Sequence, residues 1–120
     1  AMARHLEPGG VLVIEPWLQP HMIQPPYLRT LVAETDDMVV FRSSRHLSFA
    51  DPSVTDMEFA YLVTTADGGS EFLVERHVMG LYTSDRYVEA FERAGLDTEF
   101  LEEGTELGRG LVVGVGSPDA

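Results

Sequence analysis

An unbroken apolar run, Val11 to Ile14, is the feature that most constrains what this chain can fold into. It follows Pro8-Gly9-Gly10, which ends any helix before it, because proline cannot continue a helix and paired glycines open a turn. The run does not alternate with polar residues, so it needs cover on both faces, as a central strand of an α/β sheet has. Glu15-Pro16-Trp17 come next, at the carboxyl end of this strand, where open α/β sheets place their ligand crevice.

The composition narrows the class of protein. The 120 residues suffice for one domain. Twenty acidic residues stand against 8 basic ones, all arginine, and the net charge of −12 argues against a broad basic face for nucleic acid or an anionic membrane. The absence of cysteine excludes disulfides and thiolate metal sites. No apolar run approaches the roughly 18 residues of a membrane span. We therefore expect a soluble, cytoplasmic domain with no nucleic-acid or membrane partner.

A loop and a short helix are expected after the apolar strand. Gln19 to Pro26 is rich in proline and is predicted to be a loop. Tyr27 to Glu34 carries Leu28, Leu31 and Val32 at helical spacing, which predicts a short helix.

Three β-rich segments then predict an antiparallel meander: Met38 to Phe49, Asp56 to Thr65 and Glu71 to Tyr82. Ala66 to Ser70 contains Asp-Gly-Gly and predicts a hairpin turn. In the third segment the apolar residues change parity, which predicts a β-bulge near Arg76 to Val78.

The last part of the chain predicts one helix and two strands. Ser84 to Ala94 has an apolar stripe at helical spacing, with Thr83 or Ser84 as its N-cap and Gly95 after its end. Strands are expected at Leu96 to Leu101 and at Leu111 to Val115, joined by a loop rich in glycine.

Taken in order, these elements resemble the C-terminal half of class I S-adenosylmethionine-dependent methyltransferases, and His5 to Pro16 is similar to their fifth-strand motif. The resemblance implies an α/β fold, or α+β as a fragment: the C-terminal half of a Rossmann-like methyltransferase sheet, a three-stranded antiparallel meander and one main helix. It implies a single partial domain over 1–120, made of the fifth-strand motif and linker (1–36), the antiparallel insertion (37–82), and the helix with the final hairpin (83–120).

Three further features narrow the resemblance: Glu15-Pro16-Trp17 with the proline-rich stretch after it, the meander through Leu81-Tyr82-Thr83, and the ending Gly108-Arg109-Gly110-Leu111. Together they resemble the N,N-dimethyltransferases of nucleotide-linked amino sugars, which serve antibiotic biosynthesis. The likeness implies a nucleotide-sugar substrate, S-adenosylmethionine as cofactor of the full-length family, and direct methyl transfer to a neutral amine, which depends on positioning.

The chain differs from that family in the segment expected to bind the cofactor. The family binds S-adenosylmethionine on a glycine-rich loop that follows a strand and opens a helix, whereas Gly9-Gly10 precede a strand here. We therefore expect that this chain alone neither binds S-adenosylmethionine nor turns over, and that it is truncated, split or wrongly started.

Five residues are candidates for binding substrate. Glu15 could bind a sugar hydroxyl or an amine and Trp17 could form an apolar wall, or the two could only cap and pack a loop. Arg109, between glycines, could grip a pyrophosphate or simply occupy a surface turn. Arg76 and Tyr82 could reach a nucleotide, or merely solvate and pack a sheet.

Two histidines are candidates for a general base or for metal ligands. His46 and His77 fall on strands expected to be neighbours, with Glu58 and Glu75 nearby, but no close metal-ligand spacing occurs and a solvated strand face is favoured. No metal is expected, and the catalytic residues stay unassigned.

Two function classes remain open. One is the substrate-side fragment of a sugar N-methyltransferase, and the other is a non-catalytic, dimeric or small-molecule-binding β-rich domain. A strand without its neighbours exposes backbone groups and apolar side chains, so we expect either a homodimer or a separate chain that supplies the missing N-terminal half.

Overall fold

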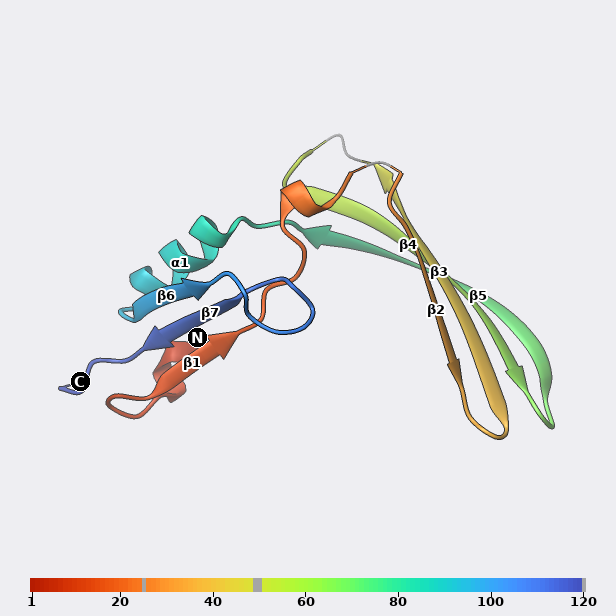
Figure 1. The fold of residues 1–120 in the computed structure, drawn as a ribbon, viewed down its shortest axis with the longest axis horizontal. Coiled ribbons are helices and arrows are strands. Elements are labelled where there is room, and N and C mark those ends of the chain that lie inside the picture. The colour runs from red at the N-terminus through yellow and green to blue at the C-terminus, as the bar shows by residue number, and fades with distance from the viewer. Residues whose placement is uncertain (25, 49–50, 120) are drawn as a thin grey trace. The chain divides into compact units, whose positions relative to one another are not determined.

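The computed structural model describes residues 1–24, 26–48 and 51–119, in two compact units (Figure 1). Unit 1 combines Ala1–Met22 with the chain from Tyr82 onward, and unit 2 is Ile23–Leu81. Within the described residues, no helix has the length and apolar character needed to cross a membrane. Pro25, in the predicted loop, and Phe49, at the end of a predicted strand, lie outside the described residues.

Unit 1 contains a three-stranded antiparallel sheet in the order β1-β7-β6. Its strands are β1 (Val11–Ile14), β6 (Asp97–Leu101) and β7 (Leu111–Val115), preceded by a 3₁₀ turn at Met2–His5. All three strands were expected from the sequence. Val11 pairs with Val115 and Ile14 with Val112, so the carboxyl end of β1 lies beside the amino end of β7. Leu101 pairs with Leu111, which brings the carboxyl end of β6 to the same edge.

The helix of unit 1, α1 (Ser84–Arg93), confirms the predicted caps. Thr83 is the N-cap, and its hydroxyl accepts a hydrogen bond from the Arg86 amide. Gly95 follows the helix with a positive φ of 82°, as a C′ glycine does. The helix covers one face of the sheet through a core of Phe91, Leu96 and Val112, against which Leu12 and Ile14 pack.

The other face of β1 is open. Val11 and Val13 are 55% and 52% exposed, while the alternate residues Leu12 and Ile14 are partly buried. In the part of the chain that the structure describes, β1 pairs only with β7. The strand β1, which the sequence predicts to be covered on both faces, is therefore covered on only one of them.

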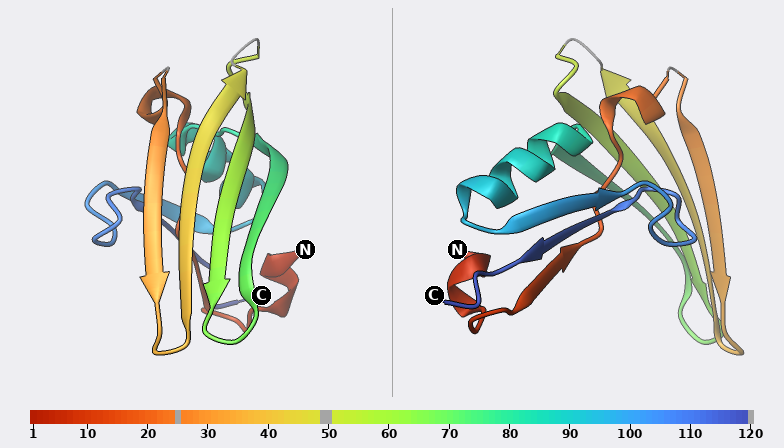
Figure 2. Two further views of the ribbon diagram at one scale, coloured as in Figure 1. Left: turned by 90° about the vertical axis from the view of Figure 1, so that its right-hand side faces the viewer. Right: turned by 60° about the vertical axis from the view of Figure 1, so that its left-hand side comes forward.

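Unit 2 is a four-stranded antiparallel sheet in the order β2-β3-β4-β5, with its strands side by side in the left panel of Figure 2. The strands are β2 (Leu28–Glu34), β3 (Met38–Ser48), β4 (Val54–Thr65) and β5 (Gly69–Gly80). The hairpin predicted at Ala66 to Ser70 joins β4 to β5, and Gly69 there has a φ of 83°. The last three strands are the predicted meander, which has one more strand than expected.

The short helix predicted for Tyr27 to Glu34 is wrong, because most of this segment is the added strand β2. The spacing of Leu28, Leu31 and Val32 fits a helix, but every residue of β2 is exposed, so no buried stripe selects that conformation. Pairing with β3 satisfies the backbone instead, from Leu28 opposite Arg45 to Glu34 opposite Val39.

The bulge predicted near Arg76 to Val78 is also wrong. The pairing of β4 with β5 runs without a break from Val54 opposite Gly80 to Thr65 opposite Gly69. Ten of the β5 positions, Gly69 to Val78, are exposed on both faces of this edge strand, so the parity of its apolar residues does not set the register. The register shift lies in β3 instead, between His46 and Ser48.

Candidate functional site

A polar cleft lies in unit 1 at the edge where β1 and β6 end and β7 begins. Its volume is about 280 Å³. It is lined by Gln19, His21, Met22, Ser84, Phe100, Glu102, Gly108 and Arg109. Gln19 is 7% exposed, and its side-chain oxygen accepts a hydrogen bond of 3.0 Å from the Ser84 amide, which fixes the first turn of α1 to this wall.

Two of the predicted residues meet beside this cleft. Arg109 Nη2 donates to Glu15 Oε1 at 3.1 Å, and the two side chains are only 24% and 26% exposed. The hydroxyl of Thr105 donates to the other carboxylate oxygen, Oε2. Arg109 Nε is buried and has no hydrogen-bond partner among the described residues. The sequence nominated both residues but did not reveal that they form a pair.

Trp17 and Tyr82 lie elsewhere in unit 1. Trp17 is half-buried, two residues after Glu15. Tyr82 is 50% exposed and makes an edge-to-face contact with Tyr87, with ring centroids 6.1 Å apart. Tyr82 and Tyr87 line a second hollow of about 270 Å³ with Arg86 and Ala90.

Arg76 lies in unit 2 and is already paired. Its Nη2 donates to Asp56 Oδ2 at 2.5 Å, across β5 and β4. Arg45 Nε likewise donates to Glu58 Oε1 at 2.9 Å. The register Arg45–Glu58–Arg76 puts both pairs on one face of the sheet, since directly opposite residues share a face. The role predicted for Arg76 stays a prediction.

The opposite face of this sheet carries the two other arginines of unit 2, which the sequence analysis missed. Arg29 lies opposite Ser44, and Arg42 lies two residues along β3, opposite Leu31. Among the described residues neither arginine has a carboxylate partner within ion-pair distance, and Arg42 Nε is buried without a partner. Alternation along β3 separates Arg42 from Arg45, but the helix predicted for Tyr27 to Glu34 hides the place of Arg29 beside Arg42.

Aromatic rings surround these two arginines. The Arg29 guanidinium lies 4.0 Å from the Tyr27 ring centroid, and that of Arg42 lies 5.5 Å from the Phe59 ring centroid. Tyr61 is directly opposite Arg42 on β4. We call Arg29, Arg42, Tyr27, Phe59 and Tyr61 the cation–aromatic face. It combines guanidinium donors with ring surfaces.

The two histidines are not neighbours, contrary to expectation. His46 and His77 both lie opposite Met57, on either side of β4. The His46 ring contacts the Thr55 hydroxyl and lies edge-to-face with the Tyr27 ring, with the two ring centroids 4.7 Å apart. Burial lowers the pKa of His46 below the ordinary value of 6.5, and the charge of Arg29 lowers it further. His77 Nε2 lies 3.4 Å from Glu75 Oε2. Over the described ranges, no group of three or more metal-ligating side chains occurs.

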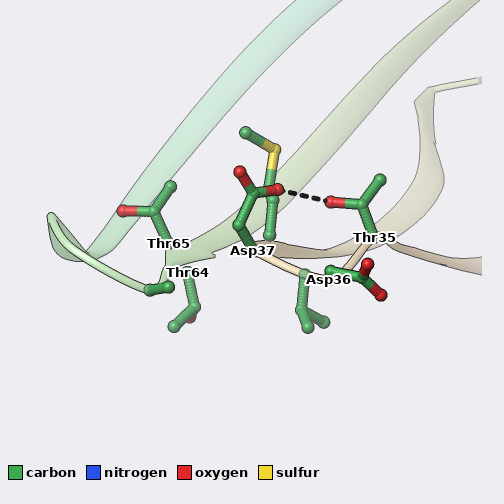
Figure 3. Close-up of a pocket in the computed structure, with 8 residues that line it drawn as sticks. Thr35, Asp36, Asp37, Thr64 and Thr65 are labelled. Carbon is green, nitrogen blue, oxygen red and sulfur yellow. Dashed lines mark hydrogen bonds between the residues drawn. The ribbon is translucent and has the colours of Figure 1, made fainter.

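A third hollow, of about 200 Å³, lies at the turn end of the unit 2 sheet (Figure 3). The Thr35 hydroxyl donates to Asp37 Oδ1 at 2.9 Å, as the dashed line shows, and the Ala66 amide donates to the Asp37 carbonyl at 2.9 Å. These bonds hold the two hairpin turns, and we assign this hollow no function.

The glycines of the chain do not form a nucleotide loop that would hold S-adenosylmethionine. The described glycines with positive φ are at positions 9, 69, 95, 104, 108 and 110, and none lies in the turn that opens α1. A strand, a glycine-rich turn and a helix N-terminus do not follow one another in the described chain. The described residues therefore contain no loop of this kind.

The chain is similar to curated proteins and to solved structures. No family model matches the chain. It is 39% identical over 114 residues to a dTDP-4-amino-2,3,4,6-tetradeoxy-D-glucose N,N-dimethyltransferase of Saccharopolyspora spinosa, covering 95% of this chain and 44% of that protein. It is 37% identical over 115 residues to a dTDP-3-amino-3,4,6-trideoxy-alpha-D-glucopyranose N,N-dimethyltransferase of Streptomyces venezuelae, covering 96% of this chain and 47% of the relative.

Solved structures of sugar methyltransferases also match the chain. The crystal structure of Streptomyces venezuelae DesVI matches with a TM-score of 0.84 at 36% identity, over 96% of this chain and 48% of that one. SAM-bound CalS10, an amino pentose methyltransferase from Micromonospora echinaspora involved in calicheamicin biosynthesis, matches with a TM-score of 0.79 at 34% identity, over 97% and 48% of the two chains. The chain thus spans about half the length of the proteins that it matches. The resemblance seen in the sequence is confirmed: the chain is similar, over about half of their length, to sugar N,N-dimethyltransferases, and one solved relative is a methyltransferase with SAM bound, which is consistent with a C-terminal half.

Proposed function

We propose that this chain is the acceptor-binding part of an S-adenosylmethionine-dependent N-methyltransferase that acts on a nucleotide-linked amino sugar in antibiotic biosynthesis. The relatives named above act on dTDP-linked amino sugars, and they are similar to this chain along nearly all of its length. The contribution of such a part is to bind and orient the acceptor, which is the main requirement of a direct group transfer.

The observation that carries the proposal is the cation–aromatic face of unit 2. Arg29 and Arg42 are the arginines of that sheet without a carboxylate partner in the described chain, although the protein carries a net charge of −12. Two guanidinium groups suit a diphosphate, because their forked donors match phosphate oxygens. The rings of Tyr27, Phe59 and Tyr61 offer surfaces for a base, and stacking of one base on an aromatic ring is worth about 1–3 kcal/mol.

The polar cleft of unit 1 is the proposed site for the sugar. Glu15 and Arg109 stand beside it, and Trp17 and Tyr82 are proposed as apolar contacts of the same substrate. Arg76 would contribute only if its guanidinium exchanged Asp56 for the ligand, so we rank it below Arg42.

Because the described residues contain no glycine-rich turn between a strand and a helix, we propose that this chain neither binds S-adenosylmethionine nor turns over by itself. Completion would come from an N-terminal half or from a second copy of the chain. Among the described residues β1 pairs only with β7, so its other edge is open, which supports an added strand there. A cytoplasmic location belongs to the same proposal.

Calorimetric titration with dTDP tests the binding role. We expect wild-type chain to bind dTDP, and Arg42→Gln to weaken binding about 10-fold or more, which corresponds to roughly 1.4 kcal/mol or more, within the range of a charge-assisted hydrogen bond. Arg29→Gln should weaken it in the same direction. Arg45→Gln is the matched control, because it removes the same charge from the same sheet on the opposite face. Equal losses in Arg42→Gln and Arg45→Gln would show a general charge effect and contradict the proposal.

A further inference from the structure

In the loop between β6 and β7, residues 102–110, the backbone at Gly104 lies close against the backbone at Gly110. A Cβ atom at Gly104 would lie 2.5 Å from the Cα of Gly110, so the two ends of the loop can touch only without side chains there. Inside the loop, the Gly108 amide donates to the Thr105 carbonyl at 3.0 Å and the Leu107 amide to the Thr105 hydroxyl at 3.3 Å. The loop is therefore a compact turn.

Glu15 binds this turn at two points. One carboxylate oxygen accepts from Thr105 and the other from Arg109, so both are engaged by the loop. Glu15 follows β1, and its two partners are 90 and 94 residues away in the sequence. The carboxylate thus ties the end of β1 to the loop that carries Arg109.

The charges around Arg109 argue against a phosphate as its ligand. The loop contains Glu102, Glu103 and Glu106, all exposed, and its one cation is already paired with Glu15. Glu102 also lines the cleft, where the other polar side chains, Gln19, His21 and Ser84, are neutral or titratable donors and acceptors. A phosphate would meet net negative charge there, whereas a sugar hydroxyl would not.

We infer that Glu15 is a positioning residue, which holds Arg109 so that its guanidinium, which lines the polar cleft, donates to a hydroxyl of the sugar there. The inference rests on the proposed function and refines it: the cleft of unit 1 takes the neutral sugar of the substrate. A guanidinium fixed before binding loses less conformational entropy when it donates to a ligand, which is the advantage that Glu15 supplies.

Two probes, dTDP-glucose and dTDP, separate the sugar from the nucleotide. Calorimetry on the full chain should show that Glu15→Gln weakens dTDP-glucose binding roughly 3- to 10-fold, the range of one hydrogen bond, and leaves dTDP binding unchanged. Arg109→Gln should do the same. Glu103→Gln is the control, because it removes a charge from the same exposed loop and should alter neither affinity.

Equal affinity of Glu15→Gln and wild type for dTDP-glucose overturns the inference. So does a parallel loss for both probes, which would mean that the substitution disturbs the whole molecule.

Amide hydrogen exchange tests, without any ligand, whether Glu15 holds the loop that carries Arg109. The Gly108 amide should exchange several-fold faster in Glu15→Gln and in Thr105→Val than in wild type, and at the wild-type rate in Glu103→Gln. If wild-type chain binds neither probe, the proposed function fails, and unchanged Gly108 exchange in Glu15→Gln would separately remove the holding role.

Discussion

The ring of Phe91 on α1 packs directly on the backbone of Gly114 in β7: a Cβ atom at position 114 would lie 2.6 Å from Phe91 Cδ1 and 2.9 Å from Leu96 Cδ1. Phe91 and Leu96 are core residues, 5% and 6% exposed. A glycine at this position therefore sets how closely the helix approaches the sheet. Only contacts between elements create this requirement, because Gly114 has no unusual backbone conformation.

Replacing Gly114 by alanine should destabilise unit 1. The added methyl group overpacks a buried site, which typically costs about 1–3 kcal/mol. Gly116→Ala is the matched control, because its nearest contact would be an ordinary 3.5 Å, and its unfolding free energy should change by less than about 0.5 kcal/mol. Urea unfolding of the two variants measures the difference. Equal stability of both would contradict the packing described here.

His46 should titrate below the ordinary histidine pKa of 6.5. Burial disfavours its charged form, and Arg29 adds repulsion, so both causes lower the pKa. Arg29→Gln should raise the pKa toward 6.5 without restoring it fully, since burial remains. NMR titration of the imidazole Cε1–H resonance measures this, with His46→Gln to assign the signal. A His46 pKa above 6.5 in wild type would refute the prediction.

The same shift makes stability depend on pH. Because the folded-state pKa of His46 lies below the unfolded value, the unfolded state binds more protons between the two. The contribution of His46 is therefore fully present above about pH 6.5 and is lost as the pH falls from there toward the folded-state pKa. Chemical unfolding of wild type and His46→Gln across this window should show a shallower pH dependence in the variant.

S-adenosylmethionine should not bind this chain with submillimolar affinity. The described residues contain no strand, glycine-rich turn and helix in succession that could hold it. Isothermal titration calorimetry with S-adenosylmethionine, run beside the dTDP titration as a positive control for folded protein, measures the affinity. A dissociation constant below about 1 mM would be incompatible with this view of the chain.

Self-association should depend on the open edge of β1. Val13→Lys places a charge on that edge, and such charges discourage strand pairing. We expect it to weaken dimerisation at least several-fold, measured by sedimentation equilibrium. Glu99→Lys, on the exposed side of β6, changes charge by a larger amount and serves as the control. A dimer equally stable in all three proteins would place the interface elsewhere.

Much of the fold was predictable because its signals are short-range. The cap at Thr83, the turn at Gly95 and the Asp-Gly-Gly hairpin each depend on a few adjacent residues. The segment Leu28–Glu34 was not predictable in this way, since its apolar spacing suits a helix and its strand conformation depends on pairing with β3. The register of β5 was missed for a related reason: an edge strand exposed on both faces has no buried side to fix it.

The candidate site shows the same difference between what local sequence signals predict and what depends on strand pairing. The sequence nominated Glu15 and Arg109 separately, from a strand end and a glycine-flanked position, but not their pairing across 94 residues. It also nominated Arg76, although Arg29 and Arg42 are the arginines of the unit 2 sheet that have no acidic partner among the described residues. Which arginine meets an acid depends on which strands are neighbours and in what register.

The sequence by itself determined the family resemblance, the order of most elements and the chain's acidic character, because these depend on local patterns and composition. The tertiary structure alone decided that Glu15 holds the loop of Arg109, and that the arginines of unit 2 lie on two faces of one sheet. The physical reason is that strand pairing joins residues far apart in the chain, and a side chain's face and partners follow from that pairing.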